Sequence, residues 1–229
     1  SRKSVCAGYA SLFEMLANAA GLTVRTIGGH ARNISRSVGQ DIIGQDVGGH
    51  AWSSVKLGKE WILIDSTWGA GNTSDTKFSF SFKPYFFGVC PEQFILSHFP
   101  EDHRWQLLSS PVTYRDFINQ PIVSCNDFFG TYELQFVTGS NCPSGFMRPS
   151  GSIQLRAPSD VSFMLEPDFS EDRDHETNTV TFRCKSGRTP KTGKLRIMAN
   201  RPSANKTEKK GLSTVTWYSY ACEFSVQTS

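Results

Sequence analysis

Three short motifs place a cysteine, a histidine and an aspartate in an order that suits nucleophilic catalysis. Cys6 is followed by small residues, His50 is followed by an alanine and a tryptophan, and Asp65 precedes a Ser-Thr-Trp sequence. A thiolate can attack a carbonyl carbon, an imidazole can move the proton, and a carboxylate can orient and support the imidazole. The sequence therefore predicts a catalytic triad of these three residues.

The position of Cys6 at the start of a predicted helix favours a reactive thiol. Leu12 and Leu16 recur at helical spacing within residues 6–20, and Gly21 is a stop signal. Backbone N–H groups at a helix start point outward and the helix dipole is positive there, which favours thiolate over thiol. Free cysteine is more commonly a small buried apolar residue. The helix start is what favours a nucleophile instead.

A predicted hairpin brings His50 and Asp65 together. Residues 50–57 and 61–65 are strand-like, and a Gly-Lys pair between them is a turn signal. The two strands run antiparallel, so their outer ends should place the histidine and the aspartate about 5 Å apart as cross-strand neighbours. The residues after this hairpin, 69–72, are expected to form a loop.

Four residues near the triad are expected to line a substrate cleft: Trp52, Trp68, Gly8 and Tyr9. Tryptophan usually fills a core, and here the two tryptophans should also shield the imidazole and carboxylate from water. The small residues that follow the cysteine, Ala7 and Gly8, would let a substrate backbone approach.

The other histidines are weaker candidates for the base. His30 repeats the Gly-His-Ala pattern of His50 but lacks a carboxylate on a paired strand. His98 and His103 flank a polar segment and are expected at the surface or in a hinge. His175 lies in a run of charged residues that is expected to be a solvated loop.

Metal and cofactor signals are missing from the sequence. It contains no Cys-x-x-Cys pair of the zinc type and no calcium loop of the EF-hand type. Cys90 precedes a proline that could start a helix, but no base lies within reach. We therefore expect neither a metal nor a cofactor, and a single reactive cysteine at Cys6.

The motifs around Cys6, His50 and Asp65 together resemble those of the transglutaminase-like superfamily. Its members have papain-like folds with a Cys-His-Asp triad. The resemblance implies that the cysteine is the nucleophile, the histidine the general base and acid, and the aspartate the orienting group. Such domains usually have helices upstream of the cysteine, so we expect N-terminal elements of the core to be missing from this chain.

A later segment of the sequence resembles one particular family within this superfamily. The Pro-Glu-Gln-Phe-Ile sequence at 91–95, the His-Phe-Pro sequence at 98–100 and the Trp-Gln-Leu-Leu sequence at 105–108 are similar to the kyphoscoliosis peptidase family. That family is associated with muscle and cytoskeletal proteins. The resemblance covers residues 1–120, and beyond them it implies only that a β-rich domain commonly follows.

The whole chain is expected to have an α+β fold with two domains. Residues 1–120 should form a papain-like transglutaminase core, with a helix packed on an antiparallel sheet. Residues 121–229 should form a β-sandwich-like domain of roughly seven strands, because strand-like runs recur between turn signals. These runs are 131–137, 151–157, 160–165, 178–184, 193–199 and 213–226.

The overall composition of the chain indicates where the protein is located and which classes of partner it binds. The chain has 229 residues and a net charge of +3, too small to indicate nucleic-acid binding. It has no apolar run long enough for a membrane span. Its six cysteines are widely and irregularly spaced, which favours reduced thiols inside the cell. We expect a cytoplasmic protein, associated with the cytoskeleton through the family resemblance, that binds neither nucleic acid nor membrane.

Two functions follow from these patterns. The first is an acyl-transfer enzyme acting on protein or peptide substrates, of peptidase, deamidase or transglutaminase type, since the triad cannot choose between them. The alternative is a catalytically weak or inactive module that binds cytoskeletal partners. Its candidate surface is the segment from Lys185 to Lys210, with nine basic residues and one acid, Glu208. A solvated loop is the ordinary interpretation of such a segment.

Overall fold

The computed structural model divides the chain into two compact units. One comprises residues 1–32 and 41–117, and the other comprises residues 33–40 and 118–229. The structure describes residues 5–43, 49–74, 77–137, 144–185, 193–203, 208–210, 213–215 and 218–227. In this described part, none of the helices is long and apolar enough to cross a membrane.

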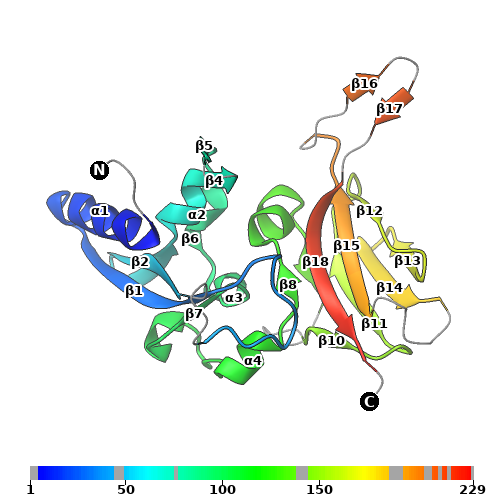
Figure 1. Ribbon diagram of the computed structural model, residues 1–229, viewed down its shortest axis with the longest axis horizontal. Coiled ribbons are helices and arrows are strands. Elements are labelled where there is room, and N and C mark those ends of the chain that lie inside the picture. Colours follow the sequence, from blue (N-terminus) through cyan, green and yellow to red (C-terminus); the bar gives the residue numbers. More distant parts are fainter. Residues whose placement is uncertain are drawn as a thin grey trace. The chain divides into compact units, whose positions relative to one another are not determined.

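The first unit is built on a five-stranded antiparallel sheet with the strand order β6-β3-β2-β1-β7 (Figure 1). Helix α1 packs against β1 and β2. The bounds are α1 (Cys6–Ala19), β1 (Thr23–Ala31), β2 (Gly49–Leu57), β3 (Glu60–Ile64), β6 (Phe87–Val89) and β7 (His98–Pro100). The predicted helix packed on an antiparallel sheet is therefore confirmed.

Helix α1 meets the sheet through small residues. Ala10 and Ala17 are buried, whereas Leu12 and Leu16 are 56% and 63% exposed. Residues three and four apart share a helix face, and the buried face here carries the alanines rather than the leucines. After the helix, Gly21 has a φ of 80°, and the next residue donates its N–H to the Ala17 carbonyl oxygen at 2.9 Å. This is a glycine-terminated helix end, as the sequence indicated.

Strands β2 and β3 form the predicted hairpin. The turn glycine, Gly58, has a φ of 61°, and the pairing runs from Leu57 opposite Glu60 to Ser53 opposite Ile64. One side of the sheet buries Val24, Val55 and Ile64 against Ala17, and a second cluster joins Ile27, Trp52, Leu63, Val89 and Phe94. The hairpin is thus held between two apolar clusters.

The segment after β3 is more regular than expected. Residues 66–70 form the short helix α2 (Ser66–Ala70), and the chain continues directly into β4 (Gly71–Ser74), which pairs with β5 (Lys77–Phe80). The predicted loop at 69–72 is therefore wrong. The reason is the residue before the helix: Asp65 accepts hydrogen bonds from the backbone N–H groups of Thr67 and Trp68 and so stabilises the first turn.

The remaining short elements of this part are η1 (Pro84–Phe86), α3 (Pro91–Phe94), η2 (His103–Gln106) and α4 (Tyr114–Ile118).

The second unit contains two sheets that face each other. One has the order β10-β18-β15-β12 with β8 added on β18, and the other has the order β13-β14-β11-β9. Phe163 and Phe182 join the sheets at 5.2 Å between ring centroids, and Phe136 and Phe224 do so at 6.2 Å. The bounds are β8 (Ile122–Val123), β9 (Gln135–Phe136), β10 (Phe146–Met147), β11 (Ser152–Arg156), β12 (Ser162–Met164), β13 (Phe169–Asp174), β14 (Thr179–Cys184), β15 (Lys194–Asn200) and β18 (Ser219–Val226). A further pair, β16 (Glu208–Lys210) and β17 (Ser213–Val215), forms a small separate ribbon.

Two segments of this unit differ from the sequence prediction. The π-helical turn η3 (Asn126–Thr131) precedes the short β9, so most of the strand expected over 131–137 does not form. Conversely, the charged run before His175 forms most of the edge strand β13, paired with β14. An edge strand can be rich in charge because one of its sides faces solvent. His175 itself is exposed, in a turn after that strand.

Candidate functional site

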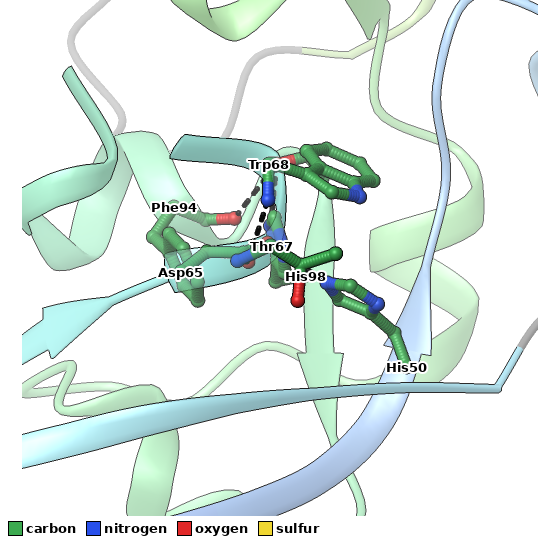
Figure 2. A network of polar contacts seen from close by, with 7 residues as sticks. His50, Asp65, Thr67, Trp68, Phe94 and His98 are labelled. Carbon is green, nitrogen blue, oxygen red and sulfur yellow. Dashed lines mark hydrogen bonds and ion pairs between the residues drawn. The ribbon is translucent and has the colours of Figure 1, made fainter. Parts of the chain in front are cut away.

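Asp65 is the centre of a buried hydrogen-bond network at the end of β3. Its Oδ2 lies 2.8 Å from Nε2 of His50 and 3.0 Å from Nε2 of His98, and its side chain has no exposed surface. Its Oδ1 accepts from the backbone N–H groups of Thr67 at 2.8 Å and Trp68 at 2.9 Å. Figure 2 shows this network from close by, with His50, Asp65, Trp68 and His98 labelled.

The hydrogen bonds keep this buried carboxyl ionised. Burial by itself would raise the pKa of Asp65, but the hydrogen bonds from His50 and His98 outweigh it and hold the pKa well below its usual range. A carboxylate that stays ionised can accept two N–H groups on one oxygen and can support an imidazolium next to it.

His50 projects from the first residues of β2. The strand register places Ser53 opposite Ile64, so Trp52 falls opposite Asp65, and His50 reaches the carboxylate diagonally rather than as the direct neighbour expected from sequence. The His50 side chain is 8% exposed and lies against the rings of Trp68 and Trp52, at centroid distances of 5.4 and 6.1 Å. Because Nε2 faces the carboxylate, Nδ1 is the nitrogen left for a thiol.

Cys6 is the first residue of α1 and is half-buried. Val5 before it is extended and provides no side-chain cap, and its carbonyl oxygen accepts from the backbone N–H groups of Gly8 at 2.9 Å and Tyr9 at 3.3 Å. The helix packs against β2, which carries His50, and against α2, which directly follows Asp65. In Figure 1 the dark blue first turn of α1 lies at the end of the helix nearer α2.

The predicted cleft residues occupy different environments. Trp52 is completely buried. Trp68 is half-buried, and so are Gly8 and Tyr9 in the first turn of α1. Trp68 and the two α1 residues thus keep some surface for a substrate, whereas the buried Trp52 packs against the His50 and His98 rings.

His98 is a member of the network, and the prediction that it lies at the surface or in a hinge is wrong. Its side chain is fully buried, its ring stacks on Phe94 at 3.9 Å between centroids, and its Nδ1 lies 2.8 Å from the Ser97 hydroxyl oxygen. Burial lowers the pKa of His98 to about 4, although Asp65 acts in the opposite direction. The sequence signal that could have found it is the apolar run before it, from Phe94 to Leu96.

A glycine allows β7 to bring His98 to this place. Gly29 in β1 pairs with His50 on one side and with Pro100 on the other. A Cβ at this position would lie 2.5 Å from the Trp52 ring and closer still to the Phe99 carbonyl oxygen. The absence of a side chain at Gly29 therefore permits the close packing that unites the two imidazoles.

The rival candidates are separate from the network. Gly29 lies opposite His50 in the strand register, so the next residue, His30, faces the other side of the sheet. There it lies near Asp41. The exposed Cys90 donates its thiol to Glu92 at 2.8 Å, and burial together with Glu92 raises the pKa of that thiol. A raised pKa makes a weaker nucleophile near neutral pH.

Two imidazoles and a carboxylate are also a donor set that transition metals accept. The ligand atoms of His50, Asp65 and His98 lie within 4.8 Å of one another. In this structure, however, the same atoms are joined by N–H···O hydrogen bonds, and two of the three side chains are fully buried. We therefore interpret the cluster as a hydrogen-bond network.

Residues 1–66, which contain Cys6, His50 and Asp65, match the family model described as the transglutaminase-like superfamily. The N-terminal part of this chain belongs to that superfamily. Kyphoscoliosis peptidase of Mus musculus is 39% identical over 176 residues, which cover 72% of this chain and 25% of the mouse protein. The predicted resemblance to the superfamily and to the kyphoscoliosis peptidase family is thus confirmed.

Two other relatives extend the comparison. Kyphoscoliosis peptidase of Homo sapiens is 39% identical over 121 residues, covering 52% of this chain and 18% of the human protein. The LIM and transglutaminase domain protein ltd-1 of Caenorhabditis elegans is 26% identical over 186 residues, covering 76% of this chain and 25% of that protein. The chain spans a quarter or less of the length of these transglutaminase-like relatives.

Proposed function

We propose that this transglutaminase-like chain is a cysteine-nucleophile acyl-transfer enzyme that acts on protein or peptide substrates. Cys6 is the nucleophile, His50 the general base and acid, and Asp65 the orienting carboxylate. The observation that carries the proposal is the 2.8 Å contact between His50 Nε2 and Asp65 Oδ2. It fixes the imidazole with Nε2–H toward the carboxylate and leaves Nδ1 to receive the thiol proton.

The proposed reaction begins with proton transfer from the thiol of Cys6 to Nδ1 of His50. The thiolate attacks the carbonyl carbon of a peptide or glutamine side chain, and a tetrahedral oxyanion forms. The backbone N–H of Cys6, at the start of α1, is a donor available to that oxyanion. When the intermediate collapses, His50 returns the proton to the leaving amine or ammonia, and a thioester to Cys6 remains.

The thioester is resolved by a second nucleophile. Water gives a carboxylic acid, the outcome of a peptidase or deamidase, whereas a lysine amine gives a new amide, the outcome of a transglutaminase. In both cases His50 removes a proton from the nucleophile and returns it to the cysteine sulfur. The names of the relatives include both a peptidase and a transglutaminase domain protein, so the acceptor has to be determined by assay.

Alkylation of Cys6 with iodoacetamide at a series of pH values tests the proposal. Because Cys90 is exposed, Cys90→Ala serves as the background, and peptide mass spectrometry identifies the alkylated residue. We expect Cys6 to be alkylated faster near neutral pH than an ordinary cysteine, because His50 can remove the thiol proton. His50→Ala should remove this advantage, and Cys6→Ala should abolish turnover of peptide substrates.

Three results together would contradict the enzyme proposal. If Cys6 reacts like an ordinary thiol, if His50→Ala does not change its reactivity, and if Cys6→Ala leaves turnover intact, the enzyme proposal fails. If the proposal holds instead, parallel assays of peptide cleavage, ammonia release and amine incorporation distinguish the three reaction types in the unmodified chain.

The alternative of a binding module with a basic surface has less support in the described residues. Three of the nine basic residues between Lys185 and Lys210 are ion-paired within their own unit. Lys194 and Arg196 contact Glu223, and Arg201 contacts Asp160. Residues 186–192 and 204–207 of the basic segment lie outside the described part. Cytoskeletal partners and location therefore stay a prediction, which a pull-down with charge-reversed Lys209 and Lys210 would test.

A further inference from the structure

We propose that His98 is a positioning residue of this site, a second imidazole that holds Oδ2 of Asp65 by donating its Nε2–H. The proposal rests on the proposed function, because His98 would act on Cys6 only through Asp65 and His50. Three features carry it: the hydrogen bonds that define the tautomer of His98, the packing that fixes its ring, and the oxygen that it shares with His50.

The tautomer follows from the partners of the two ring nitrogens. Nε2 of His98 lies 3.0 Å from Oδ2 of an ionised Asp65, so Nε2 must carry the proton, since two lone pairs would repel each other there. Nδ1 is then an acceptor, and Ser97 must donate its hydroxyl proton to it at 2.8 Å. The alternative acceptor for this hydroxyl, the Phe94 carbonyl oxygen, is more distant at 3.4 Å.

The ring of His98 is packed on several sides. Phe94 stacks on it with an interplanar angle of 12°, Trp52 meets it edge-on at 5.2 Å, and Trp68 lies at 4.6 Å. No part of the side chain is exposed. This enclosure keeps the imidazole neutral near neutral pH, so that its Nε2–H remains a donor while His50 gains and loses a proton.

The shared oxygen is where His98 would influence the chemistry. Oδ1 of Asp65 is held by two backbone N–H groups and Oδ2 by two imidazoles, so the carboxylate is restrained at both oxygens. A carboxylate with a second donor on the same oxygen is a weaker acceptor for the first. His98 therefore both fixes the orientation of Asp65 and limits how strongly Asp65 binds the N–H of His50.

Two substitutions separate the hydrogen bond from the packing. His98→Phe keeps an aromatic ring next to Phe94 but removes the N–H donor. His98→Gln removes the ring but can place an amide N–H near the position of Nε2. If His98 acts as a donor to Asp65, the glutamine variant should perform better than the phenylalanine variant; if the ring only fills space, the order is reversed. His103→Phe, at an exposed histidine, is the matched control.

The readouts are low-field proton NMR and steady-state kinetics on the full chain. The unmodified protein should show two low-field imidazole N–H signals from the bonds to Asp65. In His98→Phe one signal disappears, and that of His50 moves further downfield because Oδ2 now has a single imidazole donor. We expect kcat to fall about tenfold or more with little change in KM, since orientation rather than binding is lost. His98→Gln should retain most of the kcat that His98→Phe loses.

The outcomes that overturn the proposal do not depend on a folded variant. If the imidazole nitrogen resonances of the unmodified protein show that Nδ1 rather than Nε2 of His98 is protonated at neutral pH, the proposal is wrong. It is equally wrong if folded His98→Phe leaves the His50 signal and kcat unchanged. Its failure is distinct from failure of the proposed function, which is decided by whether alkylation of Cys6 depends on His50.

Discussion

His98 and Asp65 are separated by 33 residues in sequence, yet Nε2 of one lies 3.0 Å from Oδ2 of the other in a fully buried contact. The contact forms because β7 pairs with β1 and so places His98 near the end of the β2–β3 hairpin. Asp65 consequently has two imidazole neighbours rather than one. The predictions below follow from this arrangement and from the packing that supports it.

Replacement of Asp65 by asparagine should nearly abolish turnover. The amide has the shape of the carboxylate but no charge, and it cannot accept N–H groups from two imidazoles and two backbone positions at once. We expect kcat to fall by about 10⁴-fold, the loss that an aspartate-to-asparagine change at the orienting carboxylate produces in a triad. Asp102→Asn is the control, because the Asp102 side chain pairs with the exposed Arg104 in η2. Equal losses in both variants would contradict the assignment.

Stability should decrease as the pH falls below neutrality because of His98. Its pKa is lowered from 6.5 to about 4 in the folded chain, so between these values the unfolded state binds the proton and the folded state does not. The contribution is complete above about pH 6.5 and is lost as the pH falls toward 4, with a total of about 3 kcal/mol. Urea unfolding followed by tryptophan fluorescence at several pH values measures it. His98→Gln should remove this part of the pH dependence.

A methyl group at Gly29 should disturb the junction of β1, β2 and β7. The added Cβ would meet the Phe99 carbonyl oxygen and the Trp52 ring, so we expect Gly29→Ala to lower the free energy of unfolding by about 1–3 kcal/mol. It should also weaken the low-field N–H signals of the site. The matched control is Gly49→Ala, where nothing lies within 4 Å of the added Cβ. Similar effects at the two glycines would show that backbone entropy, not close packing, matters here.

The side of α1 that packs against the sheet leads to a fourth prediction. Ala17 is buried against the sheet, so Ala17→Leu should overpack this contact and cost about 1–3 kcal/mol of unfolding free energy. The neighbouring Leu16 is exposed, so Leu16→Gln should change stability by no more than about 0.5 kcal/mol. Chemical denaturation of both variants compares them directly. A large loss at Leu16 and none at Ala17 would place the opposite face of the helix against the sheet.

Local patterns predicted the elements that carry the site. The start of α1 at Cys6 and the β2–β3 hairpin could be read from helical spacing, a stop glycine and a turn signal, each a property of a few consecutive residues. The α+β class followed from the same patterns and is confirmed. The proximity of His50 and Asp65 was foreseen, although the register makes them diagonal rather than direct neighbours.

What the sequence could not provide was the long-range pairing. Nothing near His98 indicates that β7 will join β1. The polar segment after it suggested the surface, although an apolar run precedes it. The same limit applies to the buried face of α1. The leucines at helical spacing suggest a core-facing side, but in the structure the smaller alanines are the buried residues, because they allow the helix to approach the sheet more closely. In β13 the charges suggested a loop, because edge strands are recognised only when their partner is known.

Asp65 is at once the orienting group of His50 and the N-cap of α2. One carboxylate therefore links the integrity of a five-residue helix to the protonation chemistry on the neighbouring strand. Any event that frays the first turn of α2 releases Oδ1 and lets the carboxylate rotate away from both imidazoles. The site would then lose its competence while the nucleophile and its helix stay unchanged, so local helix unfolding and catalytic readiness are thermodynamically linked.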